Sequence, residues 1–223
     1  MVKKLLLSIR SIFLKLLRKD EASKDRKKAS SYYELGVMFY EVASSEDEYK
    51  KAVELFELSA DLGCIEALYS LGVVYAKGEG VEKDEKKAFD CFSMAASRDD
   101  IVAQTTLGFM YYEGRGVLQD YLKAFEWLEK AAILGDAAAQ SMLGIMFFEG
   151  KGVEKEYKKS VEWFSKAAKQ GLTEAQNFLG LMHSNGYGVR QNRSVAKKWY
   201  AKACDGGSQL GCDVYKTLNE QGY

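Results

Sequence analysis

The sequence predicts an all-α fold, a right-handed α-solenoid of about five 36-residue helix-turn-helix repeats. The first observation is a glycine preceded by leucine that recurs every 36 residues, at Gly36, Gly72, Gly108, Gly144 and Gly180. The second is that small, large apolar and loop residues recur at the same period in many other positions, which chance does not produce. The third is that apolar residues within each period follow helical spacing. One helical hairpin cannot bury its apolar face alone, so the repeats are expected to stack.

Composition and charge divide the chain into two parts. The 223 residues include 20 glycines and no proline, and 47% apolar with 29% charged residues is typical of a soluble globular protein rather than a disordered one. Residues 1–28 contain ten Lys or Arg against three Asp or Glu, a net charge of +7. Because the whole chain is neutral, residues 29–223 carry −7. We expect no nucleic-acid binding, since an acidic solenoid repels phosphate.

Residues 2–19 have the pattern of a basic amphipathic helix. Its apolar side holds Leu5, Leu6, Ile9, Ile12, Phe13, Leu16 and Leu17. Arg10 and Lys15 interrupt each apolar run well short of the roughly 20 residues that a membrane span needs. Two interpretations remain open: a helix that lies on an anionic membrane surface with those seven residues facing the membrane, or a capping helix on the first repeat. A targeting signal is a third, although no small-residue cleavage site follows.

Each repeat is expected to consist of a helix A, a Gly-x-Gly connection and a helix B. In the third repeat helix A carries Ala103, Leu107 and Tyr111 on one face, and helix B runs from about Tyr121 to Leu134. Glycine tolerates the left-handed backbone of a tight connection, and small residues at the helix crossing allow close approach to a large residue on the facing helix. The predicted repeats span about 30–65, 66–101, 102–137, 138–173 and 174–209, and residues 210–223 form a cap.

The repeated pattern resembles the Sel-one-like repeat, a relative of the tetratricopeptide repeat. The third repeat carries the resemblance almost position by position, from Ala103 and Gln104 through Asp120 and Trp127 to Ala132. The first repeat departs from the pattern, because "VASSEDE" stands where the others have Gly-x-Gly-Val. The family's proline after the loop valine is absent as well. The resemblance implies a scaffold or adaptor whose A helices line a concave groove that binds a peptide or protein segment.

The helical wheel assigns residues to that groove. The residues expected to line it are Tyr33, Val37, Tyr40, Tyr69, Val73, Phe109, Tyr112, Glu113, Ile145, Phe148, Glu149 and Leu181. Aromatic side chains beside carboxylates suit an extended or helical segment that carries Lys or Arg. The competing interpretation is that these aromatic rings pack against the neighbouring repeat.

The cysteines and the lone histidine indicate a structural role. Cys204 and Cys212 stand at a C-x7-C spacing across the last turn, where two packed helices can bring the sulfur atoms within bonding range. This unit resembles the cysteine-rich Helicobacter-type relatives, so Cys204–Cys212 is a possible disulfide, against a default of reduced thiols in the cytoplasm. Cys64 and Cys91 are interpreted as buried small apolar residues. His183 shares a column with three aromatic residues and is expected to pack half-buried, with no metal site.

Catalysis is not expected, and neither is a cofactor or a small-molecule substrate. The cysteine-rich relatives suggest β-lactam binding or hydrolysis as an alternative, but the only S-x-x-K sequence is Ser194 to Lys197 and its companion motifs are absent. A secreted effector is a second alternative. The expected location is the cytoplasm, and on the membrane interpretation of residues 2–19 it is the inner membrane face; the alternative is periplasmic or secreted. The partner is expected to be a protein or peptide.

Overall fold

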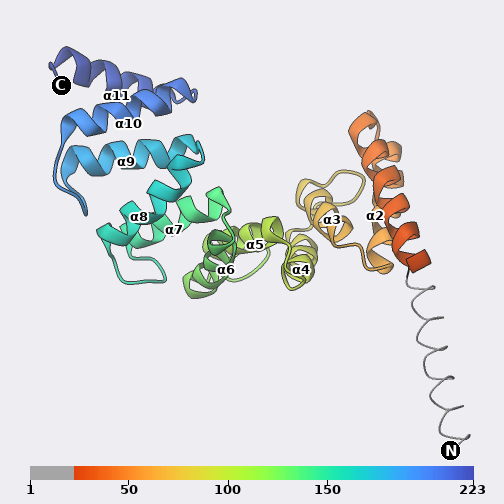
Figure 1. Ribbon diagram of the computed structural model, residues 1–223. Helices are drawn as coiled ribbons and strands as arrows, with labels where there is room; N and C mark the ends of the chain where they lie inside the picture. The colour runs from red at the N-terminus through yellow and green to blue at the C-terminus, as the bar shows by residue number, and fades with distance from the viewer. Residues whose placement is uncertain (1–22) are drawn as a thin grey trace, which may run out of the picture. The chain divides into compact units, whose positions relative to one another are not determined.

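The computed structural model describes residues 23–223, and every regular element in that range is a helix (Figure 1). The chain divides into two compact units, with the division between Arg98 and Asp99. The interpretations of residues 2–19 concern a segment outside the described range, and so does the prediction of seven membrane-facing residues. No helix among the described residues is both long enough and apolar enough to span a membrane.

The N-terminal unit contains two repeats. Its first helix covers residues 23–42, and α2 (Glu46–Asp61), α3 (Ile65–Lys77) and α4 (Glu85–Ala96) follow. The first helix includes residues 23–28, which precede the expected start of the repeats. The "VASSEDE" segment forms a short connection in which Ser45 caps α2 and the Glu48 side chain returns to the backbone of Ser45. This reciprocal capping box replaces the Gly-x-Gly loop of the later repeats.

The C-terminal unit contains three repeats and a final helix. The A helices are α5 (Ile101–Glu113), α7 (Ala137–Glu149) and α9 (Thr173–Asn185). The B helices are α6 (Tyr121–Ile133), α8 (Tyr157–Lys169) and α10 (Arg193–Asp205), and α11 (Gln209–Glu220) packs on α10. The predicted all-α repeat architecture is confirmed, and the expected end of the third helix B was one residue too late.

The helix crossings explain the small residues that recur every 36 positions. A Cβ added to Gly144 of α7 would lie 2.7 Å from the Phe164 ring of α8, and one added to Gly180 of α9 would lie 2.8 Å from the Tyr200 ring. A methyl group has no room there, so glycine lets the two backbones approach while the ring fills the space between them. Each hairpin therefore packs around one large side chain, as the sequence predicted.

The Gly-x-Gly connections combine two separate requirements. Gly150 ends α7 with a φ of 77°, and its N–H bonds the carbonyl of Met146 at 2.8 Å. The left-handed conformation favours glycine here. Gly152 also has a positive φ, and a Cβ at this residue would collide with the carbonyl of Tyr121 at the start of α6. The second glycine therefore lets the loop pack against the preceding helix B.

The core of the C-terminal unit is a series of clusters between each helix B and the next helix A. One cluster joins Leu128 and Ala131 of α6 to Leu143 and Met146 of α7, all of them fully buried. The next joins α8 to Leu179 and Met182 of α9 in the same way. These clusters fix the A helices α5, α7 and α9, of which α7 contacts both others.

Candidate protein-binding face

The predicted groove residues lie at equivalent positions on successive A helices. In the N-terminal unit Tyr33, Val37 and Tyr40 are on the first helix, and Tyr69 and Val73 are on α3; all five are half-buried. In the C-terminal unit the members are Phe109, Tyr112 and Glu113 on α5, Ile145, Phe148 and Glu149 on α7, and Leu181 on α9. Only the two glutamates of this set are exposed. The A-helix surface of each unit is termed the binding face below.

The aromatic rings of the N-terminal unit pack against helix B of their own repeat. The Tyr33 ring lies 6.0 Å from the Phe56 ring, and the Tyr40 ring lies 5.5 Å from that of Tyr49. The Tyr69 ring lies 5.3 Å from that of Phe92. These rings are half-buried, so each exposes only part of its surface.

The C-terminal unit shows the same arrangement with more aromatic contact. Tyr112 lies 5.1 Å, ring to ring, from Tyr121. Phe148 contacts Tyr157, Phe178 and Tyr187 at ring separations of 5.3, 6.2 and 5.7 Å. The competing interpretation was that these rings pack against the neighbouring repeat. Phe148 does so through Phe178 and Tyr187, whereas the contact between Tyr112 and Tyr121 lies within one repeat.

The structure brings Tyr112 and Glu149 together with a lysine from the following loop. The Tyr112 hydroxyl donates to Glu149 Oε2 at 2.8 Å, across the A helices of two successive repeats. Lys151 Nζ donates to Tyr112 Oη at 3.0 Å and forms an ion pair with Glu149 at 2.8 Å. The same ammonium group lies 5.1 Å from the centre of the Tyr112 ring. These three side chains are termed the Tyr112 junction.

An equivalent junction in the N-terminal unit has its charges in the reverse order. Tyr40 bonds Glu79, and Lys77 Nζ donates to Tyr40 Oη at 2.9 Å and pairs with Glu79 at 3.5 Å. Lys77 ends α3 and Glu79 is in the loop, whereas Glu149 ends α7 and the loop residue is Lys151. The tyrosine accommodates either order because its hydroxyl both donates and accepts hydrogen bonds.

The electrostatics of the Tyr112 junction hold all three groups in their ordinary neutral-pH states. Burial raises the pKa of Tyr112 above its usual value. The hydrogen bond from Lys151 lowers the pKa of Glu149, and the bond to Glu149 raises the pKa of Lys151. The junction is therefore a neutral phenol between a carboxylate and an ammonium group.

The residues predicted to line the groove did not include Glu79 or Lys151. Glu79 and Lys151 are the middle residues of their Gly-x-Gly loops, and they contact an aromatic residue 39 positions earlier. In the next loop Tyr187 occupies this place and packs on Phe148. A search for opposite charges at separations of 37 and 39 residues from a tyrosine would have found both junctions.

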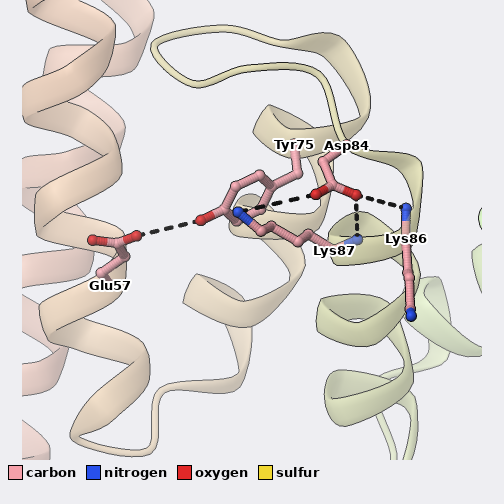
Figure 2. Close-up of polar contacts among 5 residues, drawn as sticks. All are labelled: Glu57, Tyr75, Asp84, Lys86 and Lys87. Atoms are coloured by element: carbon pink, nitrogen blue, oxygen red, sulfur yellow. Dashed lines mark hydrogen bonds and ion pairs between the residues drawn. The ribbon is translucent and has the colours of Figure 1, made fainter.

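A second polar cluster lies at the start of α4 (Figure 2). Asp84 accepts hydrogen bonds from the backbone of Lys86 and Lys87, while Lys87 Nζ lies over the Tyr75 ring at 5.3 Å. Tyr75 Oη in turn contacts Glu57 at 3.4 Å. Asp84 caps α4, so the cluster has a structural function. It repeats in the C-terminal unit, with Tyr111, Asp120 and Lys123, and with Phe147, Glu156 and Lys159.

His183 takes the aromatic position of that cluster in the last repeat and is half-buried, as predicted. Its Nδ1 is buried and has no hydrogen-bond partner among the described residues. Burial lowers the pKa of His183. Nowhere in residues 23–223 do three His, Cys, Asp or Glu side chains gather in a way that could hold a metal ion.

A cleft of about 850 Å³ lies beside the first helix in the N-terminal unit. Its lining includes Tyr33 and Glu34 of that helix and Cys64 and Glu66 at the start of α3. Cys64 stands at the N-cap position of α3, and its Sγ donates to Glu66 Oε2 at 3.1 Å. Cys64 is half-buried, so the expectation that it is buried was wrong, whereas Cys91 is buried as expected. Burial raises the pKa of Cys64, which keeps the thiol protonated.

Cys204 and Cys212 are joined by a disulfide in the structure, with their Cα atoms 4.5 Å apart. The bond connects the end of α10 to α11. Tyr200 of α10 and Leu218 of α11 form a buried cluster between the same two helices. The disulfide therefore reinforces the last helix pair.

The comparisons with known proteins identify the repeat. The family model described as Sel1 repeat matches residues 29–64, 65–100, 101–136, 137–172 and 173–208. Among the curated proteins, none matches the chain. The solved structure of c5321, described as a protective antigen of uropathogenic Escherichia coli with an SLR fold, is 36% identical with a TM-score of 0.80. The match covers 86% of this chain and 41% of that one, so the present chain spans under half of that protein.

Two further structures are similar. A Sel1 repeat protein from Oxalobacter formigenes is 26% identical with a TM-score of 0.78, over 84% of this chain and 77% of that one. Cysteine-rich protein B of Helicobacter pylori is 28% identical over 59% of this chain and 95% of that one, with a TM-score of 0.48. Sel1 repeat proteins generally mediate protein–protein interaction and are typically non-catalytic. The five matched repeats confirm the resemblance seen in the sequence, and the chain belongs to the Sel1 repeat family.

Proposed function

We propose that this chain is a non-catalytic scaffold that binds a segment of another protein along the A-helix face of its C-terminal unit. The observation that carries the proposal is a row of apolar side chains at equivalent positions on α5, α7 and α9. Phe109, Ile145 and Leu181 are all half-buried. A partner that covers such a row removes apolar surface from water while the scaffold keeps its conformation.

The charged groups beside that row favour an apolar anchor over a purely basic partner. Glu113 pairs with Arg115 at 3.5 Å, and Glu149 pairs with Lys151 at 2.8 Å. Carboxylates that already have a base nearby attract Lys or Arg of a partner less strongly than unpaired ones. We therefore propose a segment with apolar side chains that seat on the row, while the charged pairs form a polar rim.

The geometry around the S-x-x-K sequence supports a non-catalytic role. Ser194 is exposed on α10, and Lys197 Nζ donates to Asn219 Oδ1 at 2.7 Å and to the carbonyl of Tyr223. The lysine is thus engaged with the C-terminal residues. We expect no turnover of nitrocefin by the full chain. Hydrolysis that is lost in Ser194→Ala would overturn the non-catalytic proposal.

Affinity capture with mass spectrometry tests the binding face. Four proteins are immobilised in parallel: the natural chain, Ile145→Glu, Leu181→Glu and Leu122→Glu. Leu122→Glu is the matched control, because Leu122 is 65% exposed on α6 and was not assigned to the binding face. We expect one set of proteins that both face variants lose and that the control retains. Circular dichroism confirms that all variants keep their helices. Equal capture by all four proteins would refute the proposed face.

A further inference from the structure

Two apolar side chains of the first helix are exposed at positions that are buried in the later repeats. Leu35 is 42% exposed and Met38 is 63% exposed. At the equivalent positions in the following repeats every side chain is at most 5% exposed. These are Leu71, Leu107, Leu143 and Leu179 for the first position, and Val74, Met110, Met146 and Met182 for the second.

The C-terminal unit shows what normally covers this surface. Leu143 and Met146 of α7 form a buried cluster with Leu128 of α6, the helix B of the preceding repeat. Leu179 and Met182 of α9 pack in the same way on α8. The surface around Leu35 and Met38 therefore corresponds to the surface on which, in the later repeats, the preceding helix B packs. Within the described residues, no helix precedes the first one.

The residues immediately before the first helix have the properties of the missing element. Residues 2–19 carry seven apolar residues on one helical side and basic residues such as Arg10 and Lys15 largely on the other. Eighteen residues make a helix of about 27 Å, and Met38 lies about 22 Å along the first helix from residue 23, so an antiparallel helix reaches it.

The start of the first helix differs from the starts of the later A helices. Four connections from a helix B to the next helix A are three residues long: 62–64, 134–136, 170–172 and 206–208. The equivalent residues 26–28 are helical. Lys27 stands 36 residues before Gly63 and is helical, whereas Gly63 and its equivalents turn the chain. The register of the repeats therefore does not continue into the residues before the first repeat. Residues 2–19 would thus be a separate closing helix rather than part of a further repeat.

We propose that residues 2–19 form a capping helix that packs antiparallel on Leu35 and Met38, where the helix B of a preceding repeat would lie. The apolar side of the segment covers both side chains, and the basic side faces solvent, as the outer surface of a terminal repeat requires. Burial of the apolar side chains on both partners stabilises the contact. The proposal is independent of the binding face and of its partner.

Hydrogen–deuterium exchange on the full-length chain in lipid-free buffer tests this inference. Three variants are compared with the natural chain: Met38→Glu, Ile9→Glu and Ser11→Glu. Ser11→Glu is the matched control, because it adds the same charge on the side of the segment away from Ile9. We expect amides of residues 5–17 to exchange at least about tenfold more slowly than an unstructured peptide. Met38→Glu and Ile9→Glu should abolish that protection, and Ser11→Glu should retain it.

The other possible occupants give different results. Slow exchange that appears only after addition of phosphatidylglycerol-containing vesicles would assign the segment to a membrane surface and overturn the proposal. Protection that grows with protein concentration would assign the exposed surface to a second copy of the chain and would also overturn it. The proposal would also be overturned if the amides of residues 5–17 were unprotected under every condition, or if their protection survived Met38→Glu.

Discussion

The Tyr112 hydroxyl on α5 donates a 2.8 Å hydrogen bond to the carboxylate of Glu149, which ends α7 one repeat later. Lys151 in the next loop contacts both residues. In the N-terminal unit the same place holds Tyr40 with Lys77 and Glu79, so the acid and the base have exchanged positions. The junction therefore requires one charge of each sign beside a tyrosine, and it does not require a fixed order.

This relationship predicts that the charges of the Tyr112 junction can be exchanged. Glu149→Lys places two lysines beside Tyr112 and should lower the melting temperature. Glu149→Lys combined with Lys151→Glu recreates the order found at Tyr40 and should restore most of the loss. Thermal unfolding followed by circular dichroism measures both, and added salt should reduce the difference. A double variant no more stable than the single one would contradict this account.

The lowered pKa of Glu149 predicts a dependence on pH. A carboxyl group whose pKa is lower in the folded state stabilises that state above its unfolded pKa of about 4.5, and the contribution is lost as pH falls through the folded value. The difference in unfolding free energy between the natural chain and Glu149→Gln should therefore be constant at neutral pH and vanish in acid. Urea unfolding at a series of pH values measures it. A difference that persists in strong acid would show that the carboxylate charge is not responsible.

Replacement of His183 should stabilise the protein in mild acid. Burial lowers the pKa of His183, so the folded state takes up its proton at a lower pH than the unfolded chain, whose value is about 6.5. Protonation of His183 therefore does not affect the free energy of unfolding well above pH 6.5, and it lowers that free energy as the pH decreases below 6.5. His183→Phe matches Phe147 at the equivalent position and should remove this contribution. Denaturant unfolding on both sides of pH 6.5 compares the variant with the natural chain, and identical pH profiles would refute the assignment.

The glycine at each helix crossing should be sensitive to a single added methyl group. Gly144→Ala places a Cβ 2.7 Å from the Phe164 ring, so the ring or the backbone must move. We expect a loss of about 1–3 kcal/mol in unfolding free energy, as for other overpacked cores. The same substitution should cost less in a Phe164→Val background, because the ring is gone. Additive losses in the double variant would exclude a clash with Phe164.

The sequence was sufficient for the repeats because local signals and long-range packing agree there. Gly144, Gly150 and Asp120 recur at one period and correspond to a crossing, a helix end and a helix cap in the structure. The junctions were harder to predict from the sequence, since Tyr112, Glu149 and Lys151 occupy repeat positions at which the residue type changes between repeats. Periodicity reveals what recurs and conceals pairs that vary together. Residues 23–28 are also helical, although the first repeat was expected to begin at about residue 30.

Two buried serines of the C-terminal unit allow the last prediction. Ser160 Oγ donates to the carbonyl of Gly144 at 2.7 Å, whereas Ser141 Oγ on α7 is buried with no partner among the described residues. Ser160→Ala should therefore lose about 1 kcal/mol, while Ser141→Ala removes an unpaired polar group and should be neutral or stabilising. Chemical denaturation of the two variants side by side measures the contrast. Since Ser141 lies one helical turn before Ile145, weaker partner capture by a fully stable Ser141→Ala would show that its hydroxyl serves binding. A clear loss of stability in Ser141→Ala would instead mean that the hydroxyl has a structural partner, such as an ordered water molecule.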